Sequence, residues 1–406
     1  MDSQRNGYNG QMTSSMDFDH YIERRGTDSI KWNLYPEDVL PLWVADMDFV
    51  SPPAVLERLT DRINHGIFGY GTASKALVQL IIDRLWNRYH WKVSPEAIVF
   101  IPGVVTGLNL FCQAFRAHSD RIVLQTPVYP PIHQAPGNAG ATAVFSPLTL
   151  TSSGRYEIDF DLLAEQFKSG AKTFLLCNPH NPIGRVFTQD ELARLADLCV
   201  QYDVLVCSDE IHGDLIFDDR THIPLAALSS EIESRTVTYM APSKTYNIAG
   251  LECAYAVIPN PDLRQQLVNA RKGIVPYVNI LGLAAAEAAY TGGNSWLAEL
   301  LVYLTHNRDL LQRFFQENLP EIKIYPAEGT YLAWLDCRSL NLPEPQKFFL
   351  ESCKVGLNNG LDFCEGGEGF VRLNFGCPTN TLQQALDRIK TGLDQRKFPH
   401  GPAEEN

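Results

Sequence analysis

Four short stretches of this chain supply, in order, a glycine-containing turn, an amide, a carboxylate and a lysine. Their sequences are PGVVT at residues 102–106, NPHNPIG at 178–184, SDEIH at 208–212 and APSK at 241–244. A turn before a helix can hold a phosphate, an amide can donate to a phenolate oxygen, a carboxylate can pair with a pyridinium nitrogen, and a lysine can form an imine with an aldehyde. Pyridoxal 5′-phosphate (PLP) needs all four groups, so the ordered set predicts this cofactor.

The turn at residues 102–106 follows the apolar run IVFI and precedes a helical pattern. Gly103 would let the backbone approach a phosphate closely. Val104, Val105 and Thr106 would present their amides at the start of a helix, where the dipole also attracts an anion. Taken alone, such a turn is more often an ordinary helix cap, so the prediction depends on the other three stretches.

Asp209 ends an apolar run and is expected at a sheet edge, where ligands bind. Its carboxylate would keep a pyridine nitrogen protonated, so that the ring can take up a carbanion's electron pair; a solvated loop carboxylate or a helix cap is the alternative. His212 could reach the same ring or face solvent. The Asn181 amide could donate to the ring oxygen, and Tyr129 could stack on the ring or only anchor a proline-rich turn.

Lys244 follows another apolar run, with Ser243 beside it. It lies 35 residues after Asp209 (244 − 209), which leaves room for one β-α-β return to the same sheet edge. A partly desolvated lysine has a lowered pKa and can supply the imine nitrogen. Arg372 lies between apolar neighbours in a predicted strand. Its guanidinium could fix the α-carboxylate of an amino acid through two parallel hydrogen bonds, or it could belong to a structural salt bridge.

From about residue 97, short apolar runs alternate with longer helical patterns along the chain, and these elements must position the site residues. Strands are predicted at 98–101, 121–124, 173–177, 204–207 and 236–239, and helices at 106–117 and 188–202. Nearly continuous apolar strands between helices are typical of a parallel sheet covered on both faces. The predicted fold class is therefore α/β, with a large domain built on a mostly parallel sheet.

The last part of the chain predicts a smaller α+β domain. It has helical patterns at 297–316 and 382–393, and strands within 321–335 and at 369–375. The predicted division is a disordered extension at 1–16, an N-terminal segment of the small domain at 17–60, the large domain at 61–290, the rest of the small domain at 291–393 and a flexible tail at 394–406. The apolar stretch at 280–290 is expected to be a buried helix.

The composition and charge of the chain argue against several classes of function. The chain has 406 residues, 45% hydrophobic and 20% charged, and a formal net charge of −13, which disfavours nucleic-acid binding. Nine scattered cysteines without ligand-like spacing predict reduced thiols in the cytoplasm and no metal site. Residues 1–15 lack the apolar run of a signal peptide, and no apolar stretch approaches the roughly 20 residues that span a bilayer.

Together these residues resemble the fold-type I PLP enzymes of the aspartate-aminotransferase-like superfamily, and most of all the MalY/PatB-type cystathionine β-lyase and C–S lyase subgroup. The resemblance covers about residues 17–393. Besides the stretches given above, it is carried by PLWVADMDF at 41–49, FGYG at 68–71, Thr245 after the lysine, EGTY at 328–331 and VRLN at 371–374.

The resemblance implies a role for each site residue. Lys244 would bond to the cofactor and act as acid and base at Cα and C4′, and Asp209 would pair with the pyridinium. Gly103, Val104, Val105 and Ser243 would hold the phosphate, Asn181 and His212 would contact the ring, Tyr129 would stack on it, and Arg372 would bind the substrate carboxylate. The family is homodimeric, with Tyr70 reaching the neighbouring subunit's phosphate. Substrate specificity is expected near Asn181, Trp43, Tyr129 and the loops around residues 277 and 359.

Two positions depart from the wider aminotransferase pattern. His212 stands where a tyrosine is usual, and Glu252 where a phosphate-binding arginine is common. Both departures fit the lyase subgroup. The predicted reaction is a β-elimination that converts L-cystathionine or a related cysteine S-conjugate to a thiol, pyruvate and ammonia. Transamination of a small amino acid is the alternative, and a regulatory protein of the same fold that acts through a partner is another.

Overall fold

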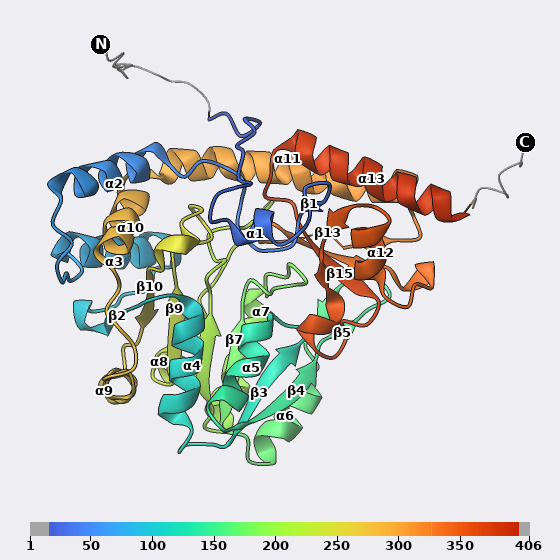
Figure 1. The fold of residues 1–406 in the computed structure, drawn as a ribbon. Helices are drawn as coiled ribbons and strands as arrows, with labels where there is room; N and C mark the ends of the chain where they lie inside the picture. The colour runs from blue at the N-terminus through green and yellow to red at the C-terminus, as the bar shows by residue number, and fades with distance from the viewer. Residues whose placement is uncertain (1–15, 326, 398–406) are drawn as a thin grey trace, which may run out of the picture.

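A seven-stranded sheet forms the frame of the larger part of the molecule in the computed structural model, which describes residues 16–325 and 327–397 (Figure 1). The strand order is β2-β10-β9-β8-β7-β3-β4, and every neighbouring pair is parallel except those that β10 makes with β2 and β9. The predicted mostly parallel sheet is confirmed. The strands are β2 Ile98–Ile101, β3 Arg121–Thr126, β4 Thr142–Pro147, β7 Thr173–Cys177, β8 Leu205–Asp209, β9 Thr236–Met240 and β10 Ala254–Val257.

Helices cover both faces of this sheet, because its central strands carry apolar side chains at nearly every position. Along β7, Leu175 and Cys177 pack in one core cluster with α4, α5 and α9, whereas Phe174 and Leu176 pack on the other face with α6 and α7. Successive side chains of a strand point to opposite faces, so a continuous apolar run is buried on both. These helices are α4 Val104–Phe115, α5 Pro130–Asn138, α6 Phe160–Lys168, α7 Gln189–Gln201 and α9 Pro261–Ala270.

A four-stranded antiparallel sheet of order β11-β12-β15-β14 forms the frame of the C-terminal part, with three helices around it. A separate parallel pair, β1 with β13, joins the N-terminal segment to this part. The elements are β1 Leu40–Pro41, β11 Lys323–Ile324, β12 Leu332–Asp336, β13 Val355–Gly356, β14 Asn358–Asn359, β15 Phe370–Asn374, α11 Asn294–Asn318, α12 Pro345–Glu351 and α13 Thr379–Lys397. The smaller α+β unit is thus confirmed.

The remaining elements flank the large sheet. Helices α2, α3 and α10 lie together beside β2 and β10 in Figure 1, and α10 packs against both other helices. A short hairpin, β5 with β6, follows β4. Their bounds are α1 Ile30–Asn33, α2 Pro53–His65, α3 Lys75–Tyr89, β5 Thr149–Leu150, β6 Tyr156–Glu157, α8 Ser230–Glu233 and α10 Ile280–Gly292. None of the helices among the described residues is long and apolar enough to cross a membrane.

Side-chain caps define where two of the helices begin. The Ser74 hydroxyl accepts from the Leu77 N–H at 2.9 Å and starts α3. Thr188 and Glu191 form a reciprocal capping box that starts α7. Each cap satisfies backbone N–H groups that lack an acceptor in the first turn of a helix. Helix α3 carries Arg84 and Arg88, which contact Asp214 in the turn after β8.

The structure corrects several predicted boundaries. The predicted boundary at 60/61 falls inside α2, and the one at 290/291 falls inside α10. Residues 394–397 of the predicted tail are helical, because α13 continues to Lys397 and Arg396 donates to the Leu340 carbonyl at 2.9 Å. Met16 is held by a bond from its N–H to Glu299 Oε2 at 2.6 Å, whereas the rest of the predicted extension and tail, 1–15 and 398–406, lies outside the described residues. The grouping of segments into domains stays a prediction.

Candidate active site

A cavity of about 360 Å³ lies at the carboxyl ends of the sheet strands. The side chains and turns that follow β2, β3, β7, β8 and β9 meet there because parallel strands present the same ends at one sheet edge. The structure brings nine of the predicted site residues into the cavity wall: Gly103, Val104, Val105, Tyr129, Asn181, Asp209, His212, Ser243 and Lys244. Glu252, which the departures from the aminotransferase pattern singled out, also lines the cavity.

The turn at Gly103 delivers the start of α4 to the cavity. Gly103 has φ of +85°, which a side chain would strain, and no atom lies near the position of a Cβ there. Backbone conformation, rather than lack of space, therefore requires glycine. The first N–H groups of α4 have no acceptor within the helix and face the side where a phosphate would sit. The Ser243 hydroxyl, buried beside them, donates to the Cys253 carbonyl at 3.4 Å.

Asp209 ends β8 as a buried carboxylate, 5% exposed, with little to stabilise its charge. Among the described residues it accepts one hydrogen bond, from the Ile211 N–H at 3.2 Å. Burial raises the pKa of its carboxyl from 3.8 to about 7, because a low-dielectric environment disfavours the ionised form. A cationic ring nitrogen in the cavity would restore the charge of Asp209, and a buried carboxylate without a cationic partner is otherwise costly.

Lys244 follows β9 and faces Asp209 across the cavity. Its Nζ donates to the Ala45 carbonyl oxygen at 2.7 Å. Burial lowers the pKa of the amine from 10.5 to about 8; Arg372 lowers it further, while Asp46 and Asp209 oppose the change. About a tenth of the lysine is therefore unprotonated at pH 7, far more than at the ordinary pKa of 10.5, and both nucleophilic attack and proton abstraction require the unprotonated amine.

Arg372 on β15 lies behind Asn181 and is 3% exposed. Its guanidinium donates to the Asn181 side-chain oxygen at 2.9 Å, the Asn358 side-chain oxygen at 2.6 Å and the Trp43 carbonyl at 3.0 Å. The amide oxygen of Asn181 is thus occupied, so its NH₂ group is the part free to donate into the cavity. The Nε of Arg372 is buried with no acceptor in the described structure. Burial lowers the pKa of Arg372 to about 10.

His212 lines the cavity with Lys244, and Tyr331 is buried beside His212. Burial lowers the pKa of His212 to about 3, so its ring is neutral, and its Nδ1 is buried without a partner. The Tyr331 ring lies edge-on to it at 6.1 Å between centroids, and the Tyr331 hydroxyl donates to the same Ala45 carbonyl at 2.9 Å. Tyr129 is fixed through its backbone N–H, which donates to the Asn181 carbonyl at 3.0 Å.

Three predicted site residues, Arg372, Trp43 and Tyr70, do not line this cavity within one chain. Arg372 is connected to it through its bond to Asn181. Trp43 contributes only its backbone carbonyl, to Arg372, while its indole N–H donates to the Lys31 carbonyl at 3.1 Å. Tyr70 is fully exposed and lines a separate groove with the segment around Tyr277. Its placement is compatible with a contact to another subunit, which a single chain does not contain.

Several residues that the structure places at the site have no predicted role of their own. The Ala45 carbonyl holds Lys244, and Asn374 binds the Val44 and Asp46 carbonyls at 2.7 and 2.6 Å. Both lie in stretches that the resemblance used, as does Tyr331. Asn358, which orients Arg372, lies in no such stretch; the sequence indicated only a specificity loop around residue 359 and no role for Asn358 itself. Its contact arises because β14 pairs beside β15, with Asn358 opposite Arg372.

The donor set fits PLP. One buried carboxylate lacks a cationic partner, one lysine is desolvated within the same cavity, one amide can donate, and a helix starts at the cavity wall. No group of three or more His, Cys, Asp or Glu side chains among the described residues is arranged to hold a metal ion.

Comparisons with known proteins agree with this geometry. The family model for aminotransferase class I and II matches residues 37–389. Cystathionine β-lyase PatB of Bacillus subtilis is 41% identical over 93% of this chain and 100% of its own length. A PLP-bound putative aminotransferase of Clostridium difficile has a TM-score of 0.90 and 38% identity over 93% of this chain and 100% of that one. Cystalysin of Treponema denticola, which contains PLP, has a TM-score of 0.90 and 32% identity over 94% and 99%.

Proposed function

The chain belongs to the class I and II aminotransferase family, whose model matches residues 37–389, and we propose that it is a PLP-dependent carbon–sulfur β-lyase. Its reaction converts L-cystathionine, or a related cysteine S-conjugate, and water to a thiol (homocysteine in the case of cystathionine), pyruvate and ammonia. The observation that carries the proposal is that one cavity is lined both by a desolvated lysine, Lys244, and by a buried carboxylate without a cationic partner, Asp209. The similarity to PatB, a named cystathionine β-lyase, favours elimination within this family.

Different cavity residues would bind different groups of the cofactor. The start of α4 at Gly103, together with Ser243, would bind the phosphate, and Asp209 would pair with the ring nitrogen. The Asn181 NH₂ group would donate to the ring oxygen, and Tyr129 would pack against the ring. When bound, PLP supplies an electron sink that stabilises negative charge at the substrate Cα. Asp209 supports that role, because a nearby carboxylate keeps the ring nitrogen protonated.

Lys244 is the residue that moves the proton. With a pKa of about 8, its Nζ can accept the Cα proton near neutral pH and return it to the leaving group or to solvent. The Ala45 carbonyl accepts a hydrogen bond from Nζ and so limits where the amine can point. Tyr331 binds the same carbonyl and keeps it fixed, which makes the position of the base independent of substrate.

Arg372 would orient the substrate through its α-carboxylate. No side-chain carboxylate pairs with it among the described residues, and three neutral oxygens hold its guanidinium in place. Charge-assisted bonds from a preformed guanidinium fix both position and rotation of a carboxylate. A fixed carboxylate would align the Cα–H bond with Lys244, because Asn181, to which Arg372 bonds, lines the same cavity as the lysine.

The quaternary structure and compartment belong to the same proposal. The protein would be a homodimer, with Tyr70 completing the phosphate site of the other subunit, and it would act in the cytoplasm. Support comes from the exposed apolar segment around Tyr70 and Tyr277, and from nine cysteines that form no disulfide. Sedimentation would measure the mass in solution. Replacing Tyr70 by Phe should weaken PLP binding without changing the fold, and an unaffected PLP affinity would refute that role.

A substrate panel tests the reaction. Purified protein loaded with PLP is incubated with cysteine S-conjugates and with small amino acids, with and without a keto acid, while thiol and keto acid are both measured. Thiol and pyruvate formed without any amino acceptor support the lyase. Turnover that requires an added keto acid would instead establish transamination, which the similarity to a putative aminotransferase keeps as the second candidate. The Lys244→Ala variant is the control, and it should be inactive in both arms.

A further inference from the structure

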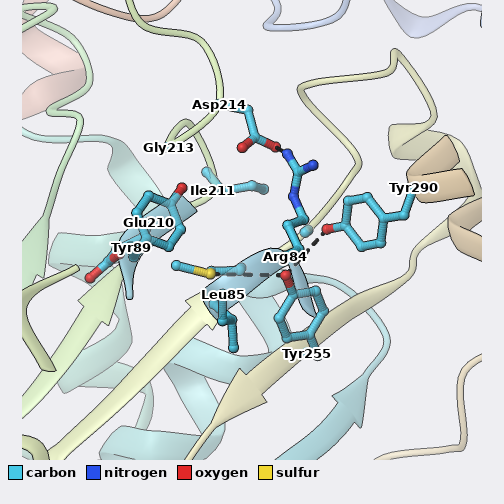
Figure 2. A pocket seen from close by; sticks show the side chains of 11 residues that line it. Arg84, Leu85, Tyr89, Glu210, Ile211, Gly213, Asp214, Tyr255 and Tyr290 are labelled. Atoms are coloured by element: carbon cyan, nitrogen blue, oxygen red, sulfur yellow. Dashed lines mark hydrogen bonds and ion pairs between the residues drawn. The ribbon is translucent and has the colours of Figure 1, made fainter. Parts of the chain in front are cut away.

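Asp214 connects three segments behind the cavity. Its carboxylate lies 2.6 Å from an Arg84 nitrogen and 3.3 Å from an Arg88 nitrogen, both on α3. The Thr245 hydroxyl donates to the same carboxylate at 3.0 Å. Figure 2 shows Asp214 above Arg84, whose guanidinium also lies 4.8 Å from the centre of the Tyr290 ring. One buried carboxylate therefore joins a helix to two loops.

Both loops carry functional side chains. Asp214 follows His212 by two residues in the turn that leaves β8 after Asp209. Thr245 immediately follows Lys244 and is fully buried. The hydrogen bond between Thr245 and Asp214 thus fixes the loop of the lysine relative to the loop of the ring-binding carboxylate, although neither residue lines the cavity.

Besides Thr245, the lysine loop is held by the side chain of Asn247, which accepts from the Met47 N–H and donates to the Met47 and Phe49 carbonyls. It lies outside helix and strand, and its turn is closed by backbone bonds from Tyr246 to Pro242 at 2.9 Å and from Ile248 to Ser243 at 3.0 Å. These bonds fix the shape of the turn but not its position relative to β8. Among the side-chain hydrogen bonds of this loop in the described structure, the one from Thr245 reaches the turn after β8, and Asp214 is itself held by charge on two arginines.

The two arginines make Asp214 a firm anchor. Burial alone would raise the pKa of its carboxyl, yet Arg84 and Arg88 hold that pKa below its ordinary value. The carboxylate stays ionised, and a hydrogen bond to an ionised acceptor is shorter and stronger than one between neutral groups.

We propose that Thr245 and Asp214 are positioning residues that set the place of the Lys244 amine relative to Asp209 during proton transfer. The proposal rests on the proposed function, in which Lys244 moves the Cα proton. Removal of the Thr245 hydroxyl lets the lysine loop shift against β8. A displacement of the order of 1 Å in a reacting group costs about 100-fold in rate, so the chemistry should respond strongly to a small structural change.

The test compares Thr245→Val, which keeps the shape and loses the hydroxyl, with Thr245→Ser, which keeps the hydroxyl. Each PLP-loaded protein is incubated with L-alanine in D₂O, and exchange of the Cα proton is followed by NMR and expressed per bound cofactor. L-alanine has no β leaving group, so exchange reports the proton step alone. Exchange should fall at least about tenfold in Thr245→Val and stay within a few-fold of wild type in Thr245→Ser. Asp214→Asn, a weaker acceptor, should also slow exchange.

A second readout does not depend on turnover. The midpoint of the pH titration of the bound cofactor's absorbance should shift in Thr245→Val and not in Thr245→Ser, because the charges that face the lysine would lie at new distances from it. Those groups are Asp46, Asp209 and Arg372, with neutral His212 beside them, and none is altered by either substitution. Melting temperatures of the loaded proteins show whether a slow variant is also unfolded.

The outcomes separate the two proposals. Wild-type exchange and an unshifted midpoint in folded Thr245→Val would overturn the positioning role. Equal losses in the Val and Ser variants would also overturn it, since the hydroxyl would then not be the cause. Absence of exchange in every protein, wild type included, would refute the proposed function, while the absorbance midpoints of the same samples would still decide whether Thr245 positions the lysine.

Discussion

Replacing Asp209 by Asn should stabilise the cofactor-free protein at alkaline pH, although it removes a residue of the proposed cofactor site. The Asp209 carboxyl has a pKa of about 7 in the folded chain against 3.8 ordinarily. The folded protein therefore holds a proton there that the unfolded chain releases above pH 3.8. Stability from this carboxyl is complete below pH 3.8 and is lost as the pH rises to about 7. At about 1.4 kcal/mol per pH unit, the loss amounts to roughly 4 kcal/mol.

The substitution keeps an oxygen that can accept from the Ile211 N–H and removes the titration. The new NH₂ group has no evident acceptor, which costs about 1–3 kcal/mol at every pH. From pH 4 to pH 8, the free energy of unfolding of the variant should therefore rise by about 4 kcal/mol relative to that of wild type. The cost of the NH₂ group does not alter this change, because it is the same at every pH.

Urea denaturation of the two cofactor-free proteins at several pH values measures this difference. PLP should reverse the order at pH 8, because a cationic ring nitrogen stabilises the ionised Asp209 only in wild type. Parallel stability profiles from pH 4 to pH 8 would refute the reasoning, since they would show that Asp209 is not destabilised by burial.

Three further predictions follow from the same contacts. Arg372→Lys keeps the charge but loses the two-pronged guanidinium, so kcat/KM for L-cystathionine should fall by about 100-fold, the equivalent of about 3 kcal/mol; a fall of less than fivefold would contradict the assignment. The pKa of His212 is about 3 in the folded chain against an ordinary 6.5, so the unfolded chain binds a proton there below pH 6.5 that the folded chain does not bind. His212→Gln should remove this effect. The free energy of unfolding, measured with urea, should then fall less steeply in the variant than in wild type, by about 1.4 kcal/mol per pH unit between pH 6 and 4. Lys31→Met removes a fully buried amine from its 2.7 Å contact with Asp48, which keeps its contacts with Arg24 and Trp32. The melting temperature should drop by the equivalent of about 1–3 kcal/mol, whereas an unchanged melting temperature would show that the pair is not stabilising.

Much of the fold and the site could be predicted from the sequence because both depend on local pattern. The prediction for β7 matches its observed bounds, whereas β8 begins one residue later than predicted and continues through Ser208 and Asp209. Residues at the ends of buried parallel strands must meet at one edge, and this rule placed Asp209 and Lys244 in one cavity before any distance was known.

The contacts around Arg372 could not be predicted, because they depend on which distant segments of the chain lie together. The acceptors around Arg372 come from residues 43, 181 and 358, and only the strand order and the path of the N-terminal segment unite them. The predicted internal domain boundaries, which stay a prediction, fall inside helices for a related reason. Helices α2 and α10 pack on each other, so no change in composition marks the point where one structural unit gives way to the next.

Multiple turnover of L-cystathionine in the absence of any keto acid tests the central claim most directly. Protein loaded with PLP is mixed with a large excess of L-cystathionine, and homocysteine, pyruvate and ammonia are measured over time. A β-lyase predicts equal amounts of all three, accumulating far beyond the amount of enzyme, with none formed by Lys244→Ala. Product that stops at one equivalent per active site, and resumes only when a keto acid is added, would contradict the claim and identify an aminotransferase.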